Sequence, residues 1–174
     1  MISIQDRPQH ILRPVRASFM AFTFVLALLF NLLPWRDING LPDLLALVLT
    51  FWCVHQPRRM GIGTAWMLGL LMDAGNGALL GQHAFAYAVL AFAAISLHRR
   101  ILWFSPWQQA AHVVVMLLGS QLLMLGVRLI AGGSFPGFAY FAGSLIAAAL
   151  WPAATFLLLF PQRRPQDVDE NRPI

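Results

Sequence analysis

The sequence predicts an all-α integral membrane protein built as a bundle of six transmembrane helices. Its 174 residues are 59% hydrophobic and only 11% charged, whereas soluble domains carry about 25% charged residues. The mean hydropathy is +0.66. Six apolar stretches recur along the chain, and arginines cluster in every second connection between them. A water-soluble chain of this kind would expose large apolar patches, so the expected solvent is the bilayer.

The six apolar stretches define the predicted spans, each compared with the roughly 20 residues needed to cross about 30 Å of hydrocarbon. They occupy residues 15–33, 41–55, 61–81, 83–97, 106–131 and 138–160. The second and fourth are short, and we expect the second to be tucked inside the bundle or matched by local bilayer thinning. Residues 1–14 are expected to form a cytoplasmic N-terminal segment, and residues 161–174 a mobile cytoplasmic tail.

Prolines and capping residues mark several of the predicted ends. Pro42 suits the first turn of the second segment, and Pro57 lies just beyond its end. In the fifth segment, Ser105 and Gln108 have the spacing of a capping box around a proline at the first helical position. Pro152 lies inside the sixth segment, so we expect a kink about one turn before it.

Arginines predict the orientation. All 12 basic residues are arginine, and ten of them fall on one side of the predicted spans: Arg7, Arg13, Arg16, Arg58, Arg59, Arg99, Arg100, Arg163, Arg164 and Arg172. Only Arg36 and Arg128 fall on the other side. The positive-inside rule therefore predicts that both termini are cytoplasmic. Membrane topology and anionic lipids explain this basic charge better than nucleic acid does, because the arginine pairs abut membrane segments.

Residues for catalysis or metal binding are scarce. The single cysteine, Cys53, lies within the second segment, so a disulfide or a cysteine-based zinc site within one chain is not expected. The five histidines lack a metal-ligand spacing. Gly119-Ser120 lacks the flanking glycines of a nucleophile elbow. We therefore expect neither an enzyme nor a cofactor.

A series of small residues spaced by four runs through the third segment: Gly61, Ala65, Gly69, Asp73, Gly77 and Gly81. On a helix these positions form one ridge, and small residues let membrane helices approach closely. Gly69, Asp73, Gly77 and Gly81 are therefore candidate partner-binding residues. The ridge could instead pack against another helix of the same chain. The stretch 73–77 also contains residues that favour turns, so the helix could break there.

Asp73 is the most unusual residue of the ridge. It lies about 21 Å beyond Arg59 along a helix, and burying a carboxylate in hydrocarbon costs at least about 2.5 to 3.5 kcal/mol. It could be a proton or ion ligand, or a hydrogen-bonded carboxyl that ties helices together. The candidate partners are Arg128, Gln121, Asn76 and Ser120.

Motifs along nearly the whole chain resemble those of the rod shape-determining MreD family. They are Pro34-Trp35, Pro57-Arg58, Gly69–Asp73, Leu80–Ala84, Trp107-Gln108-Gln109 and Trp151-Pro152. The sequence departs from the family at Asn76-Gly77, where the family often has Ser-Gly. This difference affects any role for a hydroxyl group at that position more than it affects the fold.

The resemblance implies a non-enzymatic scaffold of the bacterial inner membrane that maintains cell shape. Such a scaffold works with MreC, the MreB filament, and RodA with the elongation transpeptidase, which make lateral-wall peptidoglycan. The family fold is similar to the substrate-capture subunit of energy-coupling-factor transporters, although a shared fold does not grant a shared function.

Two hypotheses about function follow. In the first, the membrane helix of MreC docks on the small-residue ridge, and the cytoplasmic loops, with Arg99, Arg100 and Trp103, face cytosolic partners or anionic lipids. In the second, the chain is a small-molecule or lipid-handling carrier. A scaffold should fill its interior with side chains, whereas a carrier should hold a pocket walled by polar groups near Asp73.

Overall fold

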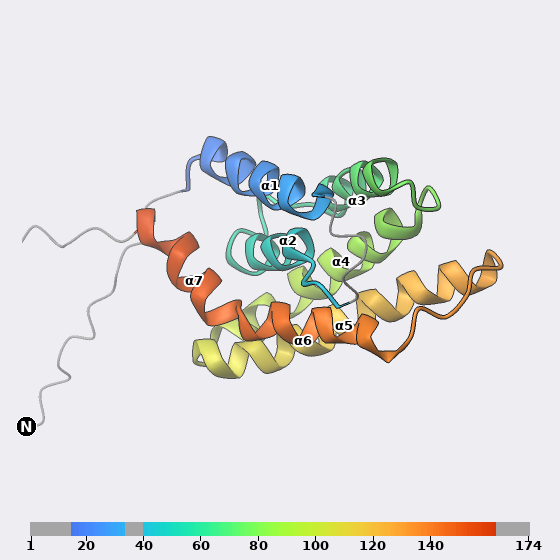
Figure 1. The fold of residues 1–174 in the computed structure, drawn as a ribbon. Coiled ribbons are helices and arrows are strands. Elements are labelled where there is room, and N and C mark those ends of the chain that lie inside the picture. Colours follow the sequence, from blue (N-terminus) through green and yellow to red (C-terminus); the bar gives the residue numbers. More distant parts are fainter. Residues whose placement is uncertain (1–14, 34–39, 163–174) are drawn as a thin grey trace, which may run out of the picture.

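The computed structural model describes residues 15–33 and 40–162, and this part of the chain is helical without a strand (Figure 1). An all-α fold is therefore confirmed. The helices are α1 (Ala17–Leu32), α2 (Leu44–His55), α3 (Ile62–Asn76), α4 (Gln82–Leu102), α5 (Pro106–Ile130), η1 (Phe138–Phe141), α6 (Ala142–Ala149), α7 (Trp151–Leu159) and η2 (Phe160–Gln162). The predicted N-terminal segment, residues 163–174 of the predicted tail, and Pro34, Trp35 and Arg36 lie outside the described residues. The first two residues of the predicted tail, Pro161 and Gln162, belong to η2.

Among the described helices, α4 and α5 are each long and apolar enough to cross a membrane. The pair from Phe138 to Ala149 and from Trp151 to Gln162 supplies a third span if the two bent halves count as one. Helices α1 and α2 are apolar but shorter. The two or three candidate spans fit an all-α membrane protein, and the arrangement with six spans stays a prediction.

Two predicted segments end at different residues in the structure. The third segment was expected to be helical over 61–81, but α3 ends at Asn76 because Gly77 adopts a left-handed backbone with φ of 61°. A second glycine, Gly81, with φ of 98°, precedes α4. At its far end α4 continues past the apolar residues to Leu102, where Arg99 and Arg100 favour the last helical turn.

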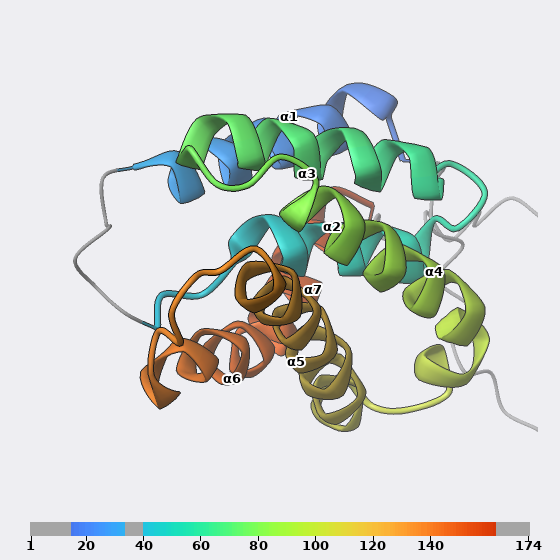
Figure 2. The ribbon, with the colours of Figure 1, turned by 90° about the vertical axis from the view of Figure 1, so that its right-hand side faces the viewer.

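Helix α2 lies at the centre of the bundle. Nine of its twelve residues are buried, and it contacts α1, α4, α5, α6 and α7. Figure 2 shows it enclosed between α1 and α3 on one side and α5 and α6 on the other. This central position fits the prediction that a short second segment is tucked inside the bundle, because a helix surrounded by protein need not match the bilayer thickness itself.

The outer surface of the described bundle is rich in large apolar side chains. More than half of the side chain is exposed at Phe22 and Leu26 of α1, Met67 of α3, Phe92 of α4 and Val115 of α5. These positions are distributed over four helices. Such a surface would drive aggregation in water and is suited to contact with lipid.

The last predicted span is broken at Leu150, as Pro152 predicts. The two helical halves on either side meet at 41°, and Leu150 separates α6 from α7. Proline lacks the N–H that would bond to the carbonyl four residues earlier, and its ring crowds that carbonyl. The predicted kink is therefore confirmed.

Candidate functional site

The carboxylate of Asp73 caps the next helix of the chain. Asp73 is fully buried, and its two oxygens accept hydrogen bonds from the backbone N–H groups of Gly81 at 2.8 Å, His83 at 2.9 Å and Ala84 at 3.3 Å. These amides belong to the N-cap and first turn of α4, where N–H groups lack partners within the helix. Gly81 has no side chain to cap them, so Asp73 of α3 supplies the oxygen atoms.

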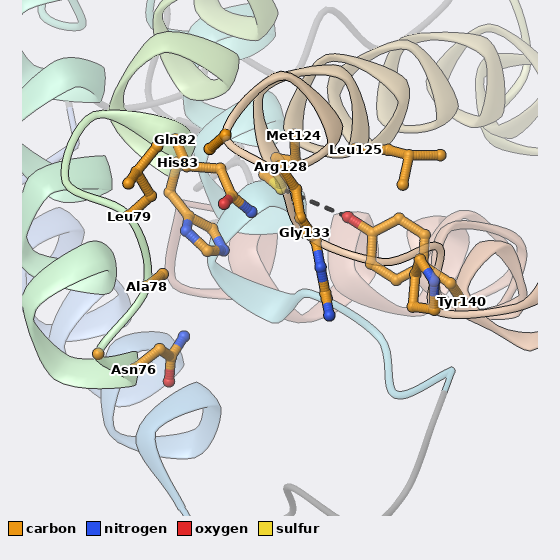
Figure 3. Close-up of a pocket in the computed structure, with 13 residues that line it drawn as sticks. Asn76, Ala78, Leu79, Gln82, His83, Met124, Leu125, Arg128, Gly133 and Tyr140 are labelled. Carbon is orange, nitrogen blue, oxygen red and sulfur yellow. Dashed lines mark hydrogen bonds between the residues drawn. The ribbon is translucent and has the colours of Figure 1, made fainter.

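His83 gives Asp73 a fourth partner. Its ring nitrogen Nδ1 lies 2.7 Å from Oδ1 of Asp73. The side chain of His83 is 15% exposed, so the pair joins a buried carboxylate to the edge of the protein. Figure 3 shows the imidazole ring of His83 between the loop before α4 and the side chain of Arg128. The contacts of Asp73 explain how its burial is compensated, because hydrogen bonds to the helix start and to an imidazole replace those to water.

Sequence reasoning missed these partners. It proposed Arg128, Gln121, Asn76 and Ser120, but none of these side chains bonds to the carboxylate in the described structure. Ser120 donates to the carbonyl of Leu117 instead. One feature of the sequence could have indicated these partners. A glycine-rich break follows Asp73, and the next helix begins without a capping side chain of its own.

A second, partly buried network joins α1, α2 and α4. The hydroxyl of Tyr87 donates to Oδ2 of Asp43 at 2.7 Å, and Oδ1 of Asp43 accepts from Nδ2 of Asn31 and from the N–H of Ala46. The ring of Tyr87 meets His83 edge to face, with centroids 5.9 Å apart. The Asp73 and Asp43 networks therefore lie side by side, and sequence reasoning singled out Asp73 but not Asp43.

The small-residue ridge is not one continuous helical surface. Gly69 lies against α4, where an added Cβ would come within 2.4 Å of Cα of Ala84. Asp73 also faces α4, whereas Gly77 and Gly81 belong to the connecting loop. The sequence left two interpretations of the ridge open, binding of a partner and packing against another helix of the same chain. Gly69 and Asp73 pack against α4 within the chain. Partner binding by Gly77 and Gly81 stays a prediction.

A cavity of about 500 Å³ lies beside His83. Its polar lining comes from Asn76, Gln82, His83, Arg128 and Tyr140. Leu79, Met124 and Leu125 contribute apolar surface. Figure 3 shows the loop before α4 on one side of the cavity and the end of α5 with the ring of Tyr140 on the other. This arrangement brings together segments from three parts of the chain.

Several family-motif residues in the described part of the chain have structural contacts. Trp151 donates from Nε1 to Oε1 of Gln109 at 3.0 Å, and Gln109 donates to the carbonyl of Phe104. Gln108 accepts from the N–H of Ser105 at 3.2 Å, which fits the predicted capping box. Trp107 is 75% exposed. Two distant motifs, at 107–109 and 151–152, therefore meet at Gln109 and Trp151.

The loop between α2 and α3 contains Pro57 and Arg58, which begin a tight turn after α2. The adjacent Arg59 donates from its guanidinium to the carbonyl of Val15. This contact joins the turn to the start of α1.

The apolar outer surface and the internally bonded polar groups define a helical membrane protein with a buried carboxyl group where α3 meets α4. A family model described as rod shape-determining protein MreD matches residues 13–160. The match covers most of the chain, which therefore belongs to the MreD family of bacterial membrane proteins and has a role in rod shape determination.

A curated relative agrees with the family match. The chain is 29% identical to rod shape-determining protein MreD of Haemophilus influenzae over 143 residues, covering 81% of this chain and 88% of that protein. No solved structure is significantly similar to the chain. The resemblance identified from the sequence motifs is thus confirmed.

Proposed function

We propose that this chain is a non-enzymatic scaffold of the bacterial inner membrane that binds MreC and connects MreB filaments with the wall-synthesising pair of RodA and the elongation transpeptidase. Membership of the MreD family carries this proposal. Both termini face the cytoplasm in the proposed orientation, which the distribution of arginines supports.

The loop between α3 and α4 is the proposed contact for the membrane helix of MreC. Its ends are set by the left-handed backbone of Gly77 and Gly81 and by the hydrogen bonds that the carboxylate of Asp73 accepts from Gly81, His83 and Ala84. Leu79 and Leu80 are 52% and 73% exposed on this loop. A loop held from both ends presents apolar side chains with little conformational entropy left to lose on binding.

Co-purification of the tagged chain with co-expressed MreC in mild detergent tests this contact. Leu80→Asn should reduce recovered MreC by severalfold, because it removes apolar contact at the loop. The matched control is Leu157→Asn, since Leu157 of α7 is similarly exposed at 70%, and this change should leave recovery at the wild-type level. Equal recovery with both variants would place the MreC contact away from the loop.

A second candidate function is the binding of a small molecule or lipid, as expected for a carrier. The cavity favours it, because polar residues wall a space beside the His83–Asp73 pair. Its volume falls within the range of about 300 to 1,000 Å³ typical of small-molecule sites. A scaffold with a bound ligand would combine both functions.

A further inference from the structure

The cavity beside His83 has a lining suited to an anionic group. Arg128 contributes a permanent positive charge, and no residue of the lining is a carboxylate. Within the described part of the chain, Arg128 forms no ion pair with Asp or Glu, and the one pair present joins His83 and Asp73. An arginine beside a cavity without a carboxylate is a natural partner for phosphate.

The position of Arg128 is set by the loop that follows α5. Gly133 packs against its stem, where an added Cβ would come within 2.7 Å of Cγ of Arg128 and 2.9 Å of its carbonyl oxygen. Figure 3 shows the Arg128 side chain extending between the His83 side and the Tyr140 side of the cavity. The guanidinium therefore borders the same space as His83.

His83 offers a second polar contact. Its Nδ1 is bonded to Asp73 at 2.7 Å, which fixes the orientation of the ring. Its other nitrogen, Nε2, forms no hydrogen bond with the described residues. Nε2 accepts a hydrogen bond in the neutral ring and donates one in the protonated ring. The Asp73 cap thus positions an imidazole at the edge of the cavity as well as starting α4.

The depth of the cavity matches the headgroup level of a bilayer. Along α5, Arg128 lies about 33 Å from Pro106 at 1.5 Å per residue, close to the hydrocarbon thickness of about 30 Å. Arg99 and Arg100 lie near the opposite end of the bundle. Arg128 therefore lies at the level of the lipid phosphates in the leaflet opposite to the one near Arg99 and Arg100. Leu79, Met124 and Leu125 supply apolar surface beside it.

We infer that the cavity binds the phosphate-bearing headgroup of an anionic glycerophospholipid, with the guanidinium of Arg128 on the phosphate and His83 and Gln82 beside the headgroup. The acyl chains extend out of the cavity along its apolar lining residues. This inference rests on the second candidate function and names its ligand class. Free phosphate shares the same chemistry but lacks the acyl chains that the leucines and methionine would contact.

Native mass spectrometry of the detergent-purified chain tests the inference with three probes: dioleoylphosphatidylglycerol, dioleoylglycerol and inorganic phosphate. The phosphatidylglycerol should stay bound at activation energies that remove dioleoylglycerol, which has the same chains without the phosphate. Millimolar inorganic phosphate should fail to displace it. Displacement by phosphate alone, or equal retention of both lipids, would overturn the inference.

Variants of the arginines locate the site. Arg128→Gln should weaken phosphatidylglycerol binding roughly tenfold, the effect of losing one charge-assisted hydrogen bond, and Arg128→Lys should retain most of it. Arg100→Gln removes one arginine from the opposite end and is the matched control. Because it leaves the cavity unchanged, it should weaken phosphatidylglycerol binding far less than Arg128→Gln does. Equal weakening by Arg128→Gln and Arg100→Gln would mean general attraction of anionic lipid and would contradict a site in the cavity.

A cavity-filling change separates failure of this inference from failure of the second candidate function. Ala78→Trp adds a bulky side chain at the lining and should abolish phosphatidylglycerol binding while the variant elutes as a folded protein. If Ala78→Trp removed another co-purified small molecule and Arg128→Gln had no effect on lipid, the cavity would be a site for a different ligand. If neither variant changed any bound species, both proposals would fail.

Discussion

The two ends of α4 differ in whether the ionisable side chains beside them are buried or exposed. At its start, the carboxylate of Asp73 is fully buried and bonded to α4 itself. At its other end, Arg99 and Arg100 are exposed beside Trp103, which is 90% exposed. Together with Phe104 and His112 they line a hollow of about 600 Å³. Changes at the first end should therefore alter folding, whereas changes at the second should alter contacts with other molecules.

The largest effect is expected from Gly69→Leu. Because a Cβ at Gly69 would meet the backbone of α4 at 2.4 Å, the two helices must separate, and overpacking of this kind costs about 3 kcal/mol or more when backbone has to move. The thermal unfolding midpoint in detergent should fall sharply or the variant should aggregate. Gly119→Leu is the control, since nothing lies within 4 Å of a Cβ there. Equal midpoints for the two variants would contradict close packing of α3 on α4.

Asp73→Ala should have the next largest effect. It removes the acceptor for three backbone amides and for His83. We expect a loss of about 2 to 3 kcal/mol in the free energy of unfolding, measured by denaturant titration in detergent. Asp73→Asn keeps one acceptor oxygen of similar size and should lose less. An unchanged unfolding midpoint for both variants would show that the cap adds nothing to stability.

Trp151→Phe should have a moderate effect. It retains a buried aromatic ring but removes the N–H that bonds to Gln109 at 3.0 Å. The expected loss is about 1 kcal/mol, the typical net value of one hydrogen bond. Trp103→Phe is the matched control because Trp103 is highly exposed, and its unfolding midpoint should stay at the wild-type value. A larger shift for Trp103→Phe than for Trp151→Phe would contradict the assigned contact.

The smallest effect on stability is expected from the double change Arg99→Glu and Arg100→Glu. Both side chains are exposed and lie in the last turn of α4, so the free energy of unfolding should fall by about 1 kcal/mol at most, through the lost interaction with the helix dipole. If the hollow contacts MreB or another cytosolic partner, recruitment of that partner should fall while reporter fusions still show the same orientation. Unchanged recruitment would leave these arginines with a role in topology alone.

Features that depend on local sequence could be predicted. Pro152 predicts the kink because proline disrupts helical bonding wherever it stands, and Ser105 with Gln108 predicts a helix start by their spacing. The end of α3 was left between two alternatives, because a glycine spaced by four suits both a packed helix and a turn. The left-handed backbone conformation of Gly77 in the structure shows that α3 ends in a turn.

Contacts between distant residues could not be predicted in the same way. The pairing of Asp73 with the start of α4 requires that α3 and α4 turn back on each other, and the bond from Tyr87 to Asp43 joins residues 44 positions apart. Composition and periodicity carry no information on such pairs. The cavity was named only as a possibility near Asp73, because its lining comes from loops whose positions depend on the whole fold.

Amide exchange at the start of α4 tests most directly whether Asp73 acts as a cap within the chain. In detergent, Asp73→Ala should speed deuterium exchange at the N–H groups of Gly81, His83 and Ala84, while Phe85, whose N–H bonds to the carbonyl of Gly81, exchanges as before. Unchanged exchange at all three amides, in a variant that still folds, would contradict the cap.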